Sequence, residues 1–138
     1  MVKTKKLRLS TKGKDDVIDI TGEVSDFVSE TQIKNGTATV FIVGSTGSIT
    51  TIEYEPALVK DIKNLDEKLV PSAVSYAHDK TWGDANGYAH LRASLIGPSL
   101  TVPVVDGKMT LGTWQQIIVI DHDNRPRSRE VIVQIMGE

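Results

Sequence analysis

The amino-acid sequence predicts an α+β protein, a mostly antiparallel two-sheet β-sandwich with about three flanking helices. Strand-like segments outnumber helical ones, and several of them are joined by short turns rich in Gly, Asn and Asp. Residues 106–107 are Asp-Gly, a pair that favours the two-residue type I′ turn of an antiparallel hairpin. A few other segments carry apolar residues at helical spacing, which predicts the helices.

The first third of the chain is expected to hold three strands and one helix. Residues 2–10 alternate polar and apolar side chains, and residues 17–20 form a second short strand. Thr21 can cap a helix that ends at the Asn-Gly pair at 35–36, because Gly tolerates the left-handed conformation at a helix C-terminus. Residues 38–43 are apolar on both faces, which is typical of a central strand covered on two sides.

The middle of the chain is expected to hold one more strand and the longest helix. Residues 49–54 follow a small polar turn at 44–48 and are expected to pair with the strand at 38–43. Pro56 suits the first turn of a helix, and Pro71 stops that helix. The apolar stripe of the helix comprises Leu58, Ile62, Leu65 and Leu69.

The last third is expected to be mostly strand and turn. A short helix over 90–96 is ended by a Gly-Pro pair. Residues 100–105 and 108–111 form the hairpin, and residues 116–120 are a strand that is apolar on both faces. Residues 129–136 form the final strand.

Size and composition exclude several classes of protein. A chain of 138 residues is expected to form a single domain over 1–138. It has no cysteine, which excludes disulfides and thiolate metal sites and favours a cytoplasmic location. The net charge is −2, with mixed signs, so a nucleic-acid partner is not expected. No secretory signal or membrane-spanning run is expected either.

The loop over 78–90 is the segment most typical of a functional site. It is rich in Gly and Asn and carries His78 and His90, twelve residues apart. The ordinary pKa of imidazole, near 6.5, suits acid–base chemistry, and imidazole is also a metal ligand. The alternative is a pair of surface imidazoles. His122 lies in an Asp- and Asn-rich turn and is interpreted as a solvated surface residue.

Carboxylates complete the set of expected catalytic and metal-binding residues. Glu53 ends an otherwise apolar strand, where its carboxylate needs a partner such as a histidine, a bound cation or an arginine from a neighbouring subunit. The alternative is a simple surface salt bridge. Asp84 can bind Mg²⁺ or cap a turn. The expected catalytic residues are His78, His90, Glu53 and Asp84. A divalent metal, Mg²⁺ or Zn²⁺, is expected at His78, His90 and Glu53, and no organic cofactor is expected.

A small phosphorylated molecule is the expected partner, since the chain offers anion-binding donors. The turn that contains Ser45 and Thr46 supplies N–H groups and hydroxyls, and Arg92 lies near the start of a short helix. Trp114 either stacks on a flat ring or packs beneath the loop as structure. The expected ligand-binding residues are Ser45, Thr46, Arg92, Ser94, Ser99 and Trp114. Neither Ser94 nor Ser99 lies in a nucleophile-elbow motif, so Ser-His-Asp hydrolase chemistry is rejected.

Five motifs carry a resemblance to a known family: Tyr76-x-His78-Asp79, Asn86-Gly87-x-x-His90-Leu91, Leu95-x-Gly97-Pro98-Ser99, Gly112-Thr113-Trp114-Gln115 and Gln134-Ile135-x-Gly137-Glu138. With them the chain resembles, nearly end to end, the YjbQ-like family, also known as secondary thiamine-phosphate synthase. The resemblance implies a β-rich sandwich, a homotrimer and a site near the subunit boundary.

The resemblance also implies an activity, the joining of a pyrimidine pyrophosphate to a thiazole phosphate with loss of pyrophosphate. Many members of the family carry a His-Thr pair where this chain has Gly44 and Ser45, while Glu53 matches the family's acidic residue. The alternatives to an enzyme are a non-catalytic trimeric protein that binds a metal or an anion, and a purely structural role.

Overall fold

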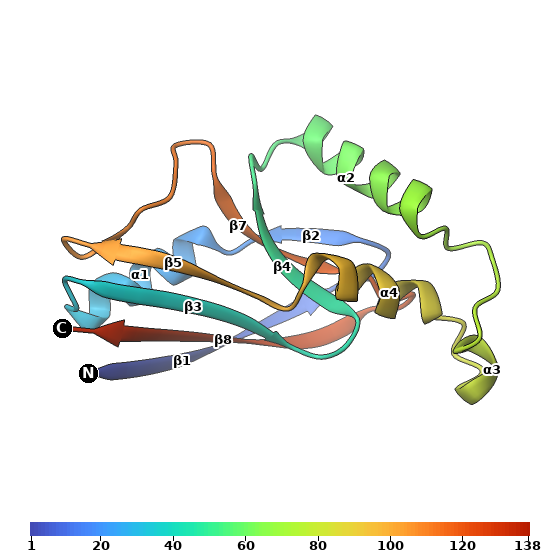
Figure 1. Cartoon of the computed structure of the whole chain (residues 1–138), viewed down its shortest axis with the longest axis horizontal. Helices are drawn as coiled ribbons and strands as arrows, with labels where there is room; N and C mark the ends of the chain where they lie inside the picture. The colour runs from blue at the N-terminus through green and yellow to red at the C-terminus, as the bar shows by residue number, and fades with distance from the viewer.

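The computed structural model describes residues 1–138 and has an α+β architecture of eight strands and four helices (Figure 1). In chain order the elements are β1 (Val2–Thr11), β2 (Asp16–Asp19), α1 (Thr21–Thr31), β3 (Gly36–Val43), β4 (Gly47–Ile52), α2 (Pro56–Leu69), α3 (Asp79–Trp82), α4 (Gly87–Ile96), β5 (Ser99–Val105), β6 (Lys108–Met109), β7 (Gln116–Asp121) and β8 (Arg127–Gly137).

The strands form two sheets in which every neighbouring pair is antiparallel. The larger sheet has the order β1-β8-β3-β5-β6, and the smaller has the order β2-β7-β4. The expected α+β class and the two antiparallel sheets are therefore confirmed. The Asp106-Gly107 turn between β5 and β6 has positive φ at both residues, 51° and 79°, as a type I′ turn requires.

One hydrophobic core joins the two sheets and α1. Fully buried side chains from β3 and β8 meet those from β4, β7 and the inner face of α1. Removing a side chain of this size from water stabilises the fold by about 1.5–3 kcal/mol. The core includes Val24, Val40, Ile42, Ile49, Ile117, Val119, Val131, Val133 and Ile135.

The sequence pattern suggested that the strand after the 44–48 turn pairs with β3. Instead this strand, β4, pairs with β7 in the smaller sheet. The chain leaves the larger sheet at Gly44, whose φ is +136°, and passes close to β3 at Gly47. A Cβ on Gly47 would lie 2.6 Å from Ile42 Cδ1, so the absence of a side chain permits this close crossing. Hydrophobic alternation identifies a strand and its buried face, but not its partner.

The helix α1 ends earlier than the Asn-Gly pair at 35–36 suggested. Gln32 takes the left-handed conformation after the helix, with φ of 59°. Gly36 instead begins β3, where a Cβ would collide with the carbonyl oxygen of Met136 on β8. Thr21 is the first helical residue rather than the cap, and its amide and hydroxyl both donate to Asp19 Oδ1.

The helix α2 has the expected bounds but a different inward face. Leu65 and Leu69 are 52% and 63% exposed, and the only residue of α2 that is buried is Asp66. Glu55 caps the start of the helix, because its carboxylate accepts hydrogen bonds from the amides of Ala57 and Leu58. A buried carboxylate on this face needs partners, and they form part of the site described below.

The outer face of β3 is uncovered in the single chain. Phe41 and Val43 are 42% and 46% exposed, although β3 lies between β8 and β5. The expectation that residues 38–43 are covered on both faces is therefore wrong for the isolated chain.

None of the four helices is both long and apolar enough to cross a membrane.

Candidate functional site

A cleft of about 320 Å³ lies between the β3–β4 turn, the loop before α4 and the start of β8. It brings together five residues that the sequence predicted from distant segments, namely Ser45, Thr46, His78, Asp84 and His90. The other lining residues are Gly44, Trp82, Asn86, Asp123, Arg127 and Arg129.

Asp79 fixes the loop that carries the two histidines. Its carboxylate accepts hydrogen bonds from the amides of Tyr76 and Gly87, at 3.0 and 2.9 Å. These two bonds hold the pKa of Asp79 below its ordinary value. Because the amides lie on either side of the loop, the bonds close it and bring His78 near the first turn of α4, where His90 lies.

The imidazole rings of His78 and His90 contact each other edge to face. Their centroids are 4.4 Å apart and their planes make an angle of 60°. Partial burial, together with the neighbouring His78, lowers the pKa of His90. A neutral imidazole offers one N–H donor and one acceptor nitrogen. His90 can therefore act at neutral pH as a donor to a ligand or as an acceptor of a proton.

Two arginines form the opposite wall of the cleft, each held by an aspartate. Arg129 donates from Nε and Nη2 to the two oxygens of Asp121, at 2.8 and 2.9 Å. Arg127 donates from Nε to Asp123 Oδ2 at 3.0 Å. Burial raises the pKa of Asp121, but its hydrogen bonds from Arg129 and Thr11 outweigh that effect, so the pKa is lowered overall. The aspartates thus stay ionised and orient the guanidinium groups.

Gly44 leaves room for the guanidinium of Arg129 at the cleft. The Nη1 of Arg129 makes no hydrogen bond within the chain, whereas its Nε and Nη2 do. A Cβ on residue 44 would lie 2.7 Å from this Nη1, and the φ of +136° is unfavourable for any side chain. A histidine at this position would therefore displace Arg129 rather than join the present cleft.

The Gly44→Ala substitution is expected to destabilise the protein by about 1–3 kcal/mol through backbone strain, with a further loss from displacement of Arg129. Chemical denaturation of the two proteins measures the difference. Gly97→Ala is the matched control, because Gly97 also has positive φ but open space around its Cβ position. An equal loss in both variants would contradict the proposed contact with Arg129.

Glu53 lies outside the cleft. The strand β4 starts beside the cleft and runs six residues away from it, a rise of about 20 Å, before it reaches Glu53. Glu53 is exposed and does not line the cleft. The expected set of metal ligands, His78, His90 and Glu53, is therefore not assembled within one chain.

Four further residues of the expected set also lie elsewhere. Ser94 is exposed and donates its hydroxyl to the carbonyl of His90. Ser99 lines a separate cavity between the sheets. Trp114 is 71% exposed, so the expectation that it packs beneath the loop is wrong. Arg92 is buried in a second polar cluster, which the sequence did not predict.

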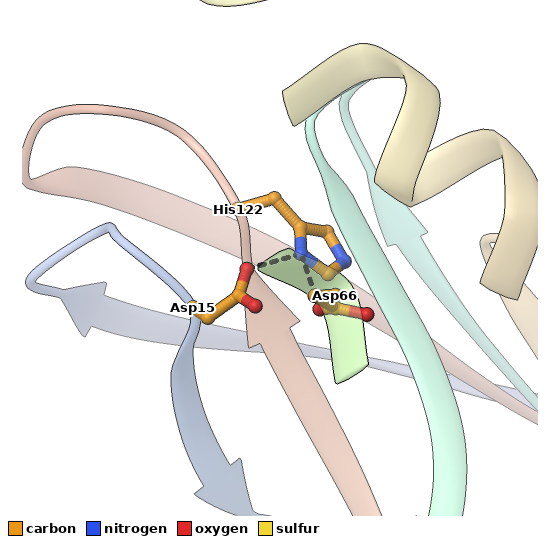
Figure 2. A group of neighbouring side chains, drawn as sticks. All are labelled: Asp15, Asp66 and His122. Carbon is orange, nitrogen blue, oxygen red and sulfur yellow. Dashed lines mark hydrogen bonds and ion pairs between the residues drawn. The ribbon is translucent and has the colours of Figure 1, made fainter. Parts of the chain in front are cut away.

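This second cluster is built around His122, beside which Asp15 and Asp66 lie (Figure 2). His122 is fully buried, so the interpretation of it as a surface residue is wrong. Its Nδ1 lies 2.5 Å from Asp15 Oδ1 and 3.6 Å from Asp66 Oδ2. Its Nε2 lies 2.8 Å from the hydroxyl oxygen of Ser48. Ser48, His122 and Asp15 are connected like a Ser-His-Asp triad, but Ser48 is fully buried and no substrate can reach it.

The two carboxyl groups of the cluster have pKa values shifted in opposite directions. Burial, and then the neighbouring Asp15, raises the pKa of Asp66 to about 8. Burial also raises the pKa of Asp15, but its contacts with His122 and Arg92 outweigh burial, and the pKa is lowered overall. Arg92 lies 3.3 Å from Asp15 and 2.8 Å from Glu67, and it also donates to the carbonyl of Val70.

One signal in the sequence could have indicated this cluster. Acidic residues at 15–16 precede a strand, and acidic residues flank His122 at the end of another. Those strands are antiparallel neighbours, with Asp16 opposite Asp121, so both groups lie at the same end of the smaller sheet. The pairing of β2 with β7 was not predicted, and without it the Asp-His-Asp segment resembles an ordinary polar turn.

Comparisons with known proteins agree in family and fold. A family model described as UPF0047 protein YjbQ-like matches residues 5–138. A UPF0047 protein from Methanothermobacter thermautotrophicus is 42% identical over 137 residues, which are 99% of this chain and 94% of that protein. One from Archaeoglobus fulgidus is 40% identical over 130 residues, which are 94% of this chain and 98% of the relative.

A solved structure extends the agreement to three dimensions. A YbjQ-like protein of unknown function from Sulfolobus solfataricus P2 matches with a TM-score of 0.95 and 33% sequence identity, covering 100% of this chain and 99% of the other. The chain therefore belongs to the YjbQ-like UPF0047 family.

Proposed function

We propose that the cleft binds the phosphate group of a small phosphorylated molecule. The proposal rests on several hydrogen-bond donors that meet in the cleft and have no acceptor within the chain. Arg129 Nη1, the rings of His78 and His90, and the hydroxyl of Ser45 all belong to the lining, and none of them donates a hydrogen bond within the chain. An anion in the cleft satisfies these groups together.

The arginine–aspartate pairs favour an anion with several oxygens. Because Asp121 holds Nε and Nη2 of Arg129, its free Nη1 has a fixed direction before any ligand arrives. Arg127 is half-buried and presents a second guanidinium to the same cleft. Orienting donors in advance reduces the entropy lost on binding. A pyrophosphate group can span more of these donors than a single phosphate.

The reaction proposed for this cleft is the transfer implied by the family resemblance. A pyrimidine pyrophosphate joins a thiazole phosphate, and a bond between the two ring systems forms as the bond to pyrophosphate breaks. Arg127 and Arg129 stabilise the negative charge of the leaving pyrophosphate. Asp84 is a carboxylate of the same lining that would hold a Mg²⁺ ion, and such an ion would offset the negative charge of the phosphates.

A second candidate is binding without turnover. It is favoured by the position of Glu53 outside the cleft and by Gly44, which stands where the family resemblance implies a histidine and whose Cβ position is close to Arg129. On this reading the cleft retains a phosphorylated molecule or an inorganic anion and releases it unchanged.

Association of three chains in the cytoplasm is part of the same proposal. The outer face of β3 exposes Phe41 and Val43 in the middle of the larger sheet, and burial against another chain would remove this apolar surface from water. Light scattering coupled to size-exclusion chromatography measures the mass in solution. A mass of about 15 kDa at micromolar concentration argues against the trimer, because the chain itself is 15.1 kDa.

Replacing Arg127 by Ala is expected to weaken pyrophosphate binding by about tenfold or more, since a charge-assisted hydrogen bond contributes about 1.5–3 kcal/mol. Isothermal titration calorimetry with inorganic pyrophosphate measures the change. Arg125→Ala is the matched control, because it removes the same charge from the same turn but does not line the cleft. If wild-type protein binds no pyrophosphate, or both variants lose affinity equally, the proposed binding site is wrong.

Turnover is tested separately from binding. The two thiamine precursors are incubated with Mg²⁺ and either wild-type protein or His90→Ala, and thiamine phosphate is measured. If wild-type protein forms more thiamine phosphate than His90→Ala does, the transferase is supported. Pyrophosphate binding without such product leaves the binding protein as the function of the cleft.

A further inference from the structure

The geometry points to a site for one divalent transition-metal ion at Asp15, Asp66 and His122, separate from the cleft. One ligating atom from each side chain lies within 4.8 Å of the others, and all three residues are buried. Figure 2 shows both carboxylates beside the same ring nitrogen of His122. One imidazole with two carboxylates suits Zn²⁺ or Mn²⁺ better than Mg²⁺, which prefers oxygen ligands and water.

Two carboxylate oxygens of this cluster have no hydrogen-bond partner. Asp15 Oδ2 and Asp66 Oδ2 are buried and make no hydrogen bond. Their side chains are only 3% and 9% exposed. Asp15 Oδ2 has a charged neighbour, Arg92 Nη1 at 3.3 Å, whereas the ion-pair neighbour of Asp66 Oδ2 is His122 Nδ1 at 3.6 Å. An ion between the carboxylates removes the cost of burying these oxygens unpaired.

The distances require only a small contraction. Zinc binds imidazole and carboxylate at about 2.0–2.2 Å, so two ligands of one ion lie at most about 4 Å apart. The three ligating atoms now lie within 4.8 Å of one another, so bringing them to this separation moves the side chains by less than about 1 Å. Binding through Nδ1 of His122 replaces its 2.5 Å contact with Asp15 Oδ1, and Asp15 becomes a ligand of the ion instead.

The hydrogen bond that would orient His122 on the ion is already present. With Nδ1 on the metal, the remaining ring N–H is at Nε2, which lies 2.8 Å from Ser48 Oγ. A metal-ligating histidine usually donates its other N–H in this way, which fixes the ring and its tautomer. Arg92 orients the carboxylate of Asp15 from the opposite side.

A route to the cluster exists through a cavity of about 240 Å³. Asp15 and Arg92 lie in its lining together with Glu67 and Ser72, and Glu67 is half exposed at 49%. Lys14 and Lys63 also line this cavity, so an ion that enters passes two cationic side chains before it meets Asp15, the one proposed ligand in the lining. This cavity does not share its lining residues with the cleft of His78 and His90.

The test is calorimetric titration of full-length protein, stripped with EDTA and dialysed, with Zn²⁺, Mn²⁺ and Mg²⁺. We expect one Zn²⁺ or Mn²⁺ per chain and Mg²⁺ at least tenfold weaker. Asp66→Asn, which keeps the shape of the side chain but removes its charge, is expected to weaken binding at least tenfold. Ser48→Ala is expected to weaken binding of the ion about tenfold, because it removes the hydrogen-bond partner of His122 Nε2.

Asp61→Asn is the matched control, because it removes the same charge from an exposed position on the same helix and should bind the ion like wild type. Visible absorption of the Co²⁺ form reports whether a nitrogen- and oxygen-bound site forms in each variant. Absence of stoichiometric binding in wild type, or equal affinity in Asp66→Asn and Asp61→Asn, overturns the proposal. Pyrophosphate binding should be unchanged in Asp66→Asn, so failure here and failure of the cleft are distinguishable.

Discussion

Replacing Arg129 by Ala is expected to destabilise the protein by about 3–5 kcal/mol, the cost of leaving a buried charge without its partner. Asp121 is fully buried, and Arg129 supplies two of its hydrogen bonds. Thr11 and the amide of Asp123 also donate to Asp121, but neither carries a charge. The lowered pKa of Asp121 depends on Arg129, so the variant buries either a bare carboxylate or a newly protonated one.

Urea denaturation at neutral pH measures this loss for the Arg129 variant. Arg8→Ala is the control, because Arg8 pairs with Glu130 at 3.5 Å on the surface and its side chain is 73% exposed. Exposed pairs of this kind contribute at most about 1 kcal/mol. The loss of stability in Arg129→Lys should lie between those of Arg129→Ala and Arg8→Ala, since lysine restores the charge but not the bidentate contact with Asp121. Similar losses in Arg129→Ala and Arg8→Ala would show that the buried pair is not stabilising.

The metal-free protein is expected to lose stability as the pH rises from about 4 towards 8, and Asp66 is the cause. Its pKa is raised from 3.8 to about 8 by burial and by Asp15. Between these values the folded state holds a proton that the unfolded state has released, so raising the pH favours unfolding. The stabilisation that comes from the raised pKa of Asp66 is complete below pH 3.8, falls as the pH rises through this range and is gone above about pH 8. Each pKa unit corresponds to about 1.4 kcal/mol, so the decline should be readily measured.

Denaturation in EDTA at several values between pH 5 and 9 tests this expectation against Asp66→Asn. The amide of Asn can donate to Asp15 as a protonated carboxyl does, but it does not ionise, so the variant should show a flatter profile. At the acid end both proteins should lose stability, because the lowered pKa values of Asp15, Asp121 and Asp123 make protonation unfavourable in the folded state. Parallel profiles from pH 5 to 9 would refute the role of Asp66.

Much of the fold was predictable because its signals are local. Alternation and turn residues gave the strands at 2–11 and 127–137 and the Asp-Gly hairpin within a few residues. The pairing of β4 was not predictable, since alternation does not identify a neighbour. On α2, the pattern indicated Leu65 and Leu69 as buried, but the helix is rotated so that Asp66 faces the protein and both leucines face outward.

The same distinction applies to the residues of the site. Some are indicated by the local sequence, and the position of others depends on tertiary contacts. The composition of the loop predicted a functional segment, since loops rich in Gly and Asn hold polar groups at the surface. The structure places His78 and His90 side by side in a cleft with the turn after β3, and that arrangement depends on tertiary contacts. The distance of Glu53 from that cleft depends on the direction of β4 after it changes sheets. His122 was misread because its burial requires partners from segments more than 50 residues away, which no local pattern records.

The attachment of α2 has a consequence for how the molecule responds to its surroundings. The helix buries one carboxylate and few apolar side chains, and Glu67 near its end pairs with Arg92. Val59 and Ile62 of the same helix are half-buried and pack against Val17, Ile118 and Ile120 of the smaller sheet, so ionic and apolar contacts together hold the helix. Electrolyte screens the partly exposed Glu67–Arg92 pair but leaves the apolar contacts unchanged, so salt concentration weakens only one of the two kinds of contact that attach the helix.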